Sequence, residues 1–241
     1  MQKINPSVQE TLNQEVEIFT STYKLYKREI EHIREAITIE DGERVVFSIP
    51  KIISLRLDGP VLFELLIPFG YTLTEAQNII FSLNSESGKT FRSGTYILLK
   101  DRNTLIISKN KDVKPNQEYE IPESSHDLKF PLSLSLKKKI RTSDFQIPSQ
   151  SSTVALDADK ITFPLKLRKW NKGDYFIPLG MIGRKKLSDF FIDRKINLLD
   201  KEEIWVLTSE EEIIWVVGQQ IDDRYKIKSE TKNILLISLK H

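Results

Sequence analysis

Apolar residues recur every three or four positions along the start of the chain, which is the spacing of one face of an α-helix. They are Val8, Leu12, Val16, Phe19, Tyr23, Tyr26, Ile30, Ile33 and Ile37. Asn5 can cap such a helix, and Pro6 suits its first turn. The pattern predicts one long helix whose apolar stripe must pack on something, with a salt-bridged solvent face formed by Lys24, Lys27, Arg28 and Arg34 among glutamates.

Shorter elements follow this helix. Residues 45–49 read as a strand, Asp58 and Pro60 open a second helical pattern, and Thr72 with Glu75 forms a capping-box pattern before a third. Residues 95–99 and 104–108 read as the two strands of a hairpin. We therefore predict a mostly helical first domain, residues 1–108, which the hairpin closes.

The rest of the chain is richer in strands. Residues 109–150 contain many Lys, Pro, Ser and Asn residues and one alternating strand, so they read as a connecting segment with some sheet. Beyond them, the stretches TVALD, KITFPLKLRKW, EIWVL, IIWVVG, YKIK and NILLISL are all strand-like. The only good helix candidate is residues 187–194. The fold class is α+β, with a sheet-dominated α+β domain over residues 151–241.

Composition limits the chemistry that is available. The 241 residues are 39% hydrophobic and 29% charged, which is typical of a globular protein. There is no cysteine, which excludes disulfides, thiolate metal sites and a cysteine nucleophile. The first ten residues show no apolar signal core, and the longest apolar run, near residues 213–217, is far too short to span a membrane. We expect a cytoplasmic protein with no membrane partner, of undetermined oligomeric state.

Charge is unevenly distributed, although the whole chain carries only +2. Residues 164–195 hold three acids and nine cations, a local charge of +6: Lys166, Arg168, Lys169, Lys172, Arg184, Lys185, Lys186, Arg194 and Lys195. Charge runs are usually solvated surface, but a basic cluster inside an otherwise acidic chain favours an anionic partner.

Several catalytic patterns can be dismissed. The segment SGKTF resembles the end of a phosphate-binding P-loop, but Leu83 stands where the pattern requires its first glycine. His32, His126 and His241 show no metal-ligand spacing, and no Ser, His and Asp grouping stands out. Taken alone, the chain shows no catalytic constellation.

The features of the segment from Pro178 to Lys195 together fit one kind of binding site. Gly180 and Gly183 permit a tight loop ahead of a helix, whose first N–H groups would point toward the same space as the adjacent cations. These features predict a phosphate site at Arg184, Lys185 and Lys186. The expected flanking contacts are Arg168, Lys169, Lys172, Arg194 and Lys195.

The same helix has an apolar side. Leu187, Phe190 and Phe191 share one face, so we interpret both phenylalanines as core residues rather than as base-stacking platforms. Asp189 and Asp193 are expected to pair with Lys185 or Lys186 and to orient these cations.

The sequence also carries a family resemblance. The stretch RKWNKGDYFIPLGMIGRKKLSDFFIDRKI, followed by IIWVVGQQIDDRYKI and TKNILLI, strongly resembles the C-terminal domain of bacterial tRNA(Ile)-lysidine synthetase. The stretch INPSVQETL with its long helix resembles the start of the middle, helical domain of that family. The family usually has arginine at the positions of Tyr175 and Gln220, which leaves any RNA contact at these two positions in doubt.

The resemblance implies a larger enzyme. In the family, an N-terminal domain uses ATP and Mg²⁺ to activate the wobble cytidine of the CAU anticodon of tRNA(Ile), and free lysine then displaces AMP. The SGGxDS loop of that domain is not found here, so no cofactor is expected to bind to this chain, which alone should be inactive. The resemblance further implies that the helical domain helps to hold the anticodon region and that the C-terminal domain holds the acceptor stem.

Two alternatives remain open at this stage. The chain could be a free-standing RNA-binding or assembly module without catalysis, because both readings predict the same basic surface. A weaker alternative is a protein-protein adaptor whose cationic cluster meets an acidic partner.

Overall fold

The computed structural model describes residues 6–110 and 117–240, which form two compact units, Met1–Asp112 and Val113–His241. Each unit has its own sheets and its own core. No helix within the described ranges is both long and apolar enough to cross a membrane. The mixture of helices and antiparallel sheets confirms the α+β class.

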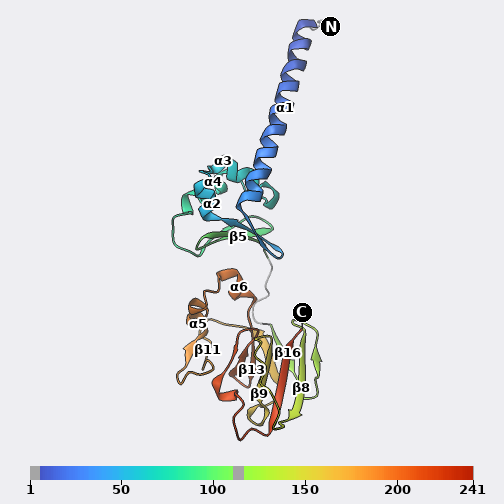
Figure 1. Cartoon of the computed structure of the whole chain (residues 1–241), viewed down its shortest axis with the longest axis vertical. Coiled ribbons are helices and arrows are strands. Elements are labelled where there is room, and N and C mark those ends of the chain that lie inside the picture. Colours follow the sequence, from blue (N-terminus) through green and yellow to red (C-terminus); the bar gives the residue numbers. More distant parts are fainter. Residues whose placement is uncertain (1–5, 111–116, 241) are drawn as a thin grey trace. The chain divides into compact units, whose positions relative to one another are not determined.

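The first unit begins with helix α1, Pro6–Ile37, as predicted; Asn5, its expected cap, lies outside the described residues. Only the C-terminal end of the apolar stripe is buried, at Ile30 and Ile37, with Ile33 packed against the same core. The remaining stripe residues are exposed: Val8, Leu12, Val16, Phe19, Tyr23 and Tyr26. Figure 1 shows α1 extending away from the rest of its unit. The stripe therefore packs within this unit for only its last two turns.

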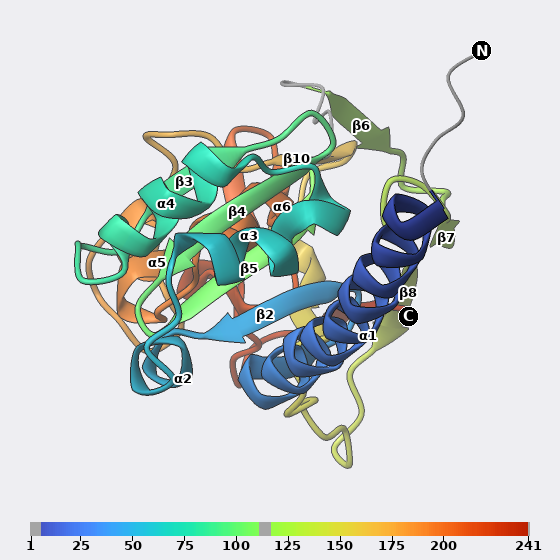
Figure 2. The same cartoon turned by 90° about the horizontal axis from the view of Figure 1, so that it is seen from above.

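A five-stranded antiparallel sheet, in the order β1-β2-β5-β4-β3, forms the base of the first unit. Its strands are β1 (Thr38–Asp41), β2 (Arg44–Ser48), β3 (Lys89–Arg92), β4 (Tyr96–Asp101) and β5 (Thr104–Lys109). The helices are α2 (Ile49–Ser54), α3 (Gly59–Leu66), the 3₁₀ turn η1 (Ile67–Phe69) and α4 (Leu73–Ser82). Figure 2 shows α3 and α4 over β4 and β5, where Leu65, Ile79 and Leu98 meet in the core.

The predicted helix starts are confirmed. The Asp58 side chain accepts the Val61 N–H at 3.0 Å, which satisfies one free amide at the start of α3. Thr72 and Glu75 form a complete capping box before α4. The hairpin is also confirmed, since β4 and β5 pair antiparallel with Asp101 opposite Thr104.

The second unit contains two larger antiparallel sheets and a short pair of strands. One sheet has the order β15-β14-β13-β10-β6, from β6 (Glu118–Ile121), β10 (Leu165–Lys169), β13 (Trp205–Ser209), β14 (Glu212–Val216) and β15 (Gln220–Ile221). The other has the order β7-β8-β16-β9, from β7 (Asp127–Leu128), β8 (Leu134–Ile140), β9 (Thr153–Asp157) and β16 (Asn233–Leu239). Leu167, Leu207 and Trp215 from the first sheet share one core with Leu136 and Leu235 from the second.

The opposite face of β13 and β14 is also buried. It packs against helix α5 (Leu187–Asp193), with Leu187, Phe190 and Phe191 between the helix and the sheet. The prediction that both phenylalanines are core residues is confirmed, since they are 3% and 0% exposed. The helix ends one residue earlier than predicted, because Arg194 is its C-cap. A second helix, α6 (Leu198–Glu203), starts after Asn197 and was not predicted.

The residues expected to connect the domains contribute to the second unit. Strand β6 extends the five-stranded sheet beside β10, and β8 pairs along its full length with β16. Two expected strands differ. The KITFPLKLRKW strand begins only at Leu165, after a cis Phe163–Pro164 bond. In the expected YKIK strand, Tyr225 ends the 3₁₀ turn η3 (Asp223–Tyr225), and Lys226 makes only an isolated bridge with Leu156. A further 3₁₀ turn, η2, spans Ala158–Lys160.

Replacing Ile37 by alanine should destabilise the first unit by about 2–5 kcal/mol, because the side chain is fully buried in a packed core. The matched change Val16→Ala, at a position that is 63% exposed on the same helix, should cost less than about 0.5 kcal/mol. Urea unfolding followed by helical circular dichroism measures both. All three tryptophans lie in the second unit, so their fluorescence transition should not move in either variant. Equal effects of the two substitutions would contradict the limited packing of α1.

Candidate nucleic-acid interface

The basic loop, residues 177–186, follows the short strand β11 (Tyr175–Phe176) and includes the short strand β12 (Lys185–Lys186). The two strands pair with Tyr175 opposite Lys186. Within the loop, the Met181 N–H donates to the Pro178 carbonyl at 2.9 Å, and Gly180 adopts a φ of +85°. This is the geometry of a type II turn, whose third position strongly favours glycine. Gly183, expected to be similar, does not have a positive φ.

Asp222 joins this loop to the sheet. Its carboxylate is fully buried, accepts the Ile177 N–H at 2.8 Å and binds the Arg224 guanidinium through both oxygens. These bonds raise the pKa of Arg224 above its ordinary value. The Asp222 N–H donates to the carbonyl of Ile214, which lies at an irregularity in the pairing of β13 with β14. The start of the loop is thus tied to the interior of the unit.

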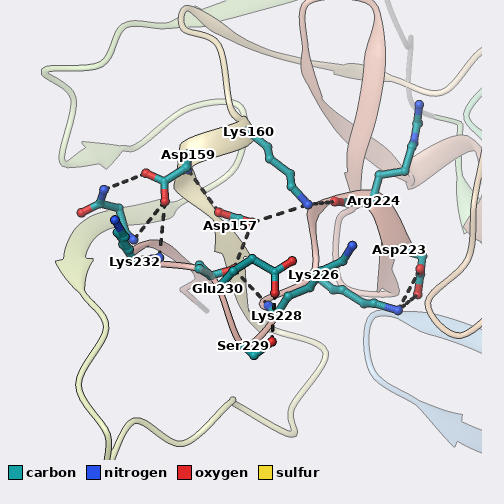
Figure 3. Close-up of polar contacts among 12 residues, drawn as sticks. Asp157, Asp159, Lys160, Asp223, Arg224, Lys226, Lys228, Ser229, Glu230 and Lys232 are labelled. Atoms are coloured by element: carbon teal, nitrogen blue, oxygen red, sulfur yellow. Dashed lines mark hydrogen bonds and ion pairs between the residues drawn. The ribbon is translucent and has the colours of Figure 1, made fainter.

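The next residue, Asp223, holds the turn itself. Its carboxylate accepts the Gly180 N–H at 2.8 Å. It also accepts two bonds from Lys226 Nζ at 2.9 Å, which Figure 3 shows. The bond from Gly180, followed by those from Lys226, lowers the pKa of Asp223 below its ordinary value. A positively charged loop is therefore held by acidic residues from a distant part of the sequence.

Tyr175 and Gln220, the two positions where the resemblance led us to expect arginine, each contact an arginine. The Arg184 guanidinium lies over the Tyr175 ring, 4.5 Å from its centre. Gln220 accepts a bond from Arg194 at 3.1 Å and donates to the Leu179 carbonyl at 3.3 Å. Both residues therefore position cations that other parts of the sequence supply.

Three of the eight predicted RNA-binding cations are half-buried and paired with acids. Arg168 makes a two-pronged contact with Asp174 at 2.8 and 3.0 Å. Lys169 pairs with Glu203 at 3.6 Å and lies over the Trp205 ring. Lys185 pairs with Asp193, as predicted, whereas Asp189, also expected to pair with these lysines, accepts a bond from Ser188.

The other five predicted cations are exposed: Lys172, Arg184, Lys186, Arg194 and Lys195. Within the described part of the chain, Lys172, Arg184 and Lys186 have no carboxylate within ion-pair distance. Arg184 and Lys186 stand on either side of the half-buried Lys185, on the same short strand and its approach. These two residues form the best-exposed positive charge of the loop.

The helix behind the predicted phosphate site is short. Helix α5 starts at Leu187, as predicted, and has seven residues; its first amide already donates to the Asp174 carbonyl at 2.9 Å. One of the amides that were expected to face a phosphate is therefore occupied.

The structure also bears on nucleotide binding. The SGKT segment leads from helix α4 into strand β3, and the Gly88 N–H donates to the Lys100 carbonyl of the sheet. A P-loop runs the other way, from strand to helix, with free amides around the phosphates. Within the described ranges, no three His, Cys, Asp or Glu side chains group as a metal site. The SGKT segment therefore does not form a P-loop for ATP with Mg²⁺.

The sequence interpretation missed the residues that hold the loop. Asp222, Asp223 and Arg224 stand together in the IDDR segment, about forty residues after the glycines they support. Two adjacent acids followed by arginine, right after a buried apolar run, were the available signal. It also missed the exposed apolar tip of the loop, where Ile182 is completely exposed.

Both units match family models of substrate-binding domains. The TilS substrate binding domain matches residues 40–110, and the TilS substrate C-terminal domain matches residues 165–238. The chain therefore consists of the substrate-binding domains of a larger enzyme.

Curated relatives agree with these matches. The tRNA(Ile)-lysidine synthase of Parabacteroides distasonis is 36% identical over 99% of this chain and 53% of its own length, and that of Bacteroides thetaiotaomicron is 33% identical over 99% and 52%. A crystal structure of a TilS C-terminal domain aligns with 51% of this chain and 95% of its own length, at 20% identity and with a TM-score of 0.43. This chain belongs to the tRNA(Ile)-lysidine synthase family and spans about half the length of the curated relatives it matches.

The Asp223 contact gives a pH prediction. Because its pKa is lowered by bonds made in the folded state, the stabilisation is present at neutral pH and is lost as the pH falls through that lowered pKa. The Gly180 amide signal in NMR should therefore move with a midpoint below 3.8, the ordinary value for aspartate. Asp223→Asn should abolish the transition at Gly180. A midpoint at or above 3.8 in the unchanged protein would contradict the contact.

Proposed function

We propose that this chain is the tRNA-recognition part of a tRNA(Ile)-lysidine synthase and that its second unit holds the acceptor stem of tRNA(Ile). The observation that carries the proposal is the pair Arg184 and Lys186, exposed and without carboxylate partners in the described structure, on a loop within the matched C-terminal domain. Arg194, Lys195 and Lys172 are proposed as further contacts.

The physics of RNA stems supports this assignment. The major groove of an A-form helix is too deep and narrow for side chains, so stems are bound mainly through phosphates and 2′-hydroxyls. Cations on a preorganised loop suit such contacts, because little side-chain and loop entropy remains to be lost on binding. The bonds from Asp222, Asp223 and Gln220 supply this preorganisation.

The remaining activity belongs to the whole enzyme. We infer that it attaches lysine to the wobble cytidine of the CAU anticodon, using ATP and Mg²⁺ on a separate domain, in the cytoplasm. The first unit would help to hold the anticodon region. The contributions of the described residues are to bind and orient the tRNA.

The test is a salt titration of tRNA(Ile) binding. Each phosphate contact contributes roughly one unit to the slope of log affinity against log salt, so Arg184→Ala with Lys186→Ala should flatten the slope by about two units. Lys185→Ala is the matched control: its ammonium is already paired with Asp193, so it should change the slope by less than either neighbour. Thermal melting should show all variants folded, since Leu187, Phe190 and Phe191 hold α5 from its other side. An unchanged slope in the folded double variant would make the loop a merely solvated surface.

A second prediction concerns catalysis. The purified 241-residue chain should release no pyrophosphate from ATP in the presence of tRNA and lysine, because neither the SGKT segment nor any other described site fits the nucleotide. Pyrophosphate release would overturn this expectation. The reading frame upstream of the first residue separates an enzyme part from a free-standing module: an in-frame SGGxDS motif supports the enzyme, and its absence would exclude it.

A further inference from the structure

Strand β8 carries three consecutive lysines, Lys137, Lys138 and Lys139, and Arg141 follows one residue after them. All three lysines are exposed. The strand lies between the two matched segments, because one family model ends at residue 110 and the other begins at residue 165. Neither the resemblance nor the comparisons assign it a role.

The strand separates these lysines onto two faces. Successive side chains of a strand alternate, so Lys138 shares a face with the core residues Leu134 and Leu136, while Lys137 and Lys139 point the other way. Lys138 pairs with Glu123, and its Nζ lies 4.7 Å from the centre of the Phe163 ring. Within the described part of the chain, Lys137 and Lys139 have no carboxylate at ion-pair distance.

A neighbouring turn adds further cations. The Arg141 guanidinium donates to the carbonyls of Lys228 and Ser229, and its N–H donates to the Lys232 carbonyl at 2.8 Å. Since these acceptors are neutral, the charge of Arg141 is not cancelled. The turn that carries Lys228 and Lys232 (Figure 3) is thereby fixed beside the end of β8.

Several carboxylates lie near this cluster, but in the described structure none is within ion-pair distance of its cations. Asp157 pairs with Lys160 at 3.5 Å. Asp159 accepts bonds from Asn233 and from the Lys232 backbone N–H, and Glu230 accepts one from Ser229. Hydrogen bonds, and after them the charges of Lys232 and Lys228, lower the pKa values of Asp159 and Glu230, so these acids compensate part of the local charge. The five cations of the cluster without a carboxylate at ion-pair distance are Lys137, Lys139, Arg141, Lys228 and Lys232.

A purely structural explanation exists for lysines at this place. Strand β7 pairs only with Leu134 and Ser135 of β8, so in the described structure residues 137–140 have a strand partner on one side only. Lysines on such edges prevent pairing with other chains. That role requires charge but not a particular sign, which makes the two explanations separable.

One feature favours RNA over simple edge protection. The Arg141 contact extends the positive charge from the strand to a second segment, which edge protection does not require. Cations spread over two neighbouring segments suit the repeated phosphates of a nucleic-acid backbone. The hollow of about 290 Å³ that holds Lys138 and Phe163 is a different feature, because Glu123 also lines it and pairs with Lys138.

We propose that Lys137, Lys139, Arg141, Lys228 and Lys232 form a second RNA-binding surface, which contacts backbone phosphates of the tRNA. This inference rests on the proposed function for the identity of the RNA. Lys137 and Lys139 lie on the four-stranded sheet, whereas α5 and its loop pack on the far face of the five-stranded sheet. The core of the unit lies between these two lysines and α5, so they would contact different phosphates from those at the basic loop.

The experiment is a charge series in the full chain, with an unmodified tRNA(Ile) transcript that carries the CAU anticodon. Lys137→Glu with Lys139→Glu should flatten the salt slope by roughly two units. The change to two glutamines should give a similar loss, and the change to two arginines should restore the original slope. Lys51→Glu with Lys89→Glu, two exposed lysines of the first unit, is the control for total charge.

The outcomes are distinct. An unchanged slope in the glutamate variant, or an equal fall in the Lys51 and Lys89 control, would overturn the second surface. Aggregation of the glutamine variant alone, with tRNA binding intact in the glutamate variant, would assign the lysines to edge protection. Loss of binding to polyglutamate together with unchanged tRNA binding would assign the surface to an acidic protein.

The Arg184 and Lys186 double variant keeps this proposal separate from the proposed function. If it alone flattens the slope, the loop binds RNA and β8 does not. If only the β8 variant does so, the second surface stands and the acceptor-stem assignment fails. If both do, combining them should give additive losses, because the residues of the two surfaces share no contacts.

Discussion

The buried carboxylate of Asp222 is the contact on which the basic loop depends. It receives an N–H from the start of the loop and a guanidinium from the following turn, while its own amide is bound to Ile214 in the interior of the sheet. A fully buried charge is costly unless it is paired and hydrogen-bonded. Here all its bonds come from the segments that must be held together, so the geometry of the loop and the stability of the unit are coupled.

The sheet that supports this contact is buried on both faces. Val206 and Val216 pack toward α5, whereas Leu207 and Trp215 pack toward the second sheet. The irregular register near Ile214 places it on the same side as Trp215, and its carbonyl becomes available to Asp222. Irregularities of this kind often re-aim groups beside binding sites. The same feature that completes the core therefore positions the loop.

Local signals predicted the fold well where the decisive contacts are local. Capping side chains three residues from their targets gave α3 and α4, and helical spacing gave α1 and the buried face of α5. The exposure of the α1 stripe could not be predicted, because an apolar stripe does not show whether the same unit supplies a surface to cover it. The loop support by Asp222 and Asp223 also escaped, because it joins residues about forty positions apart, and no periodicity marks such a pair.

Counting charges along the sequence also concealed how they are used. Of the nine cations in the basic segment, Arg168, Lys169 and Lys185 are engaged by acids, and Lys166 lies near two glutamates. By contrast, the Lys137 to Lys139 run was interpreted as part of a connecting segment, yet two of its members have no carboxylate partner in the described structure. An anion is attracted by the charge that folding leaves uncompensated at the surface, not by the charge of the segment. That quantity depends on which acids the fold brings within about 4 Å, and only the tertiary structure supplies it.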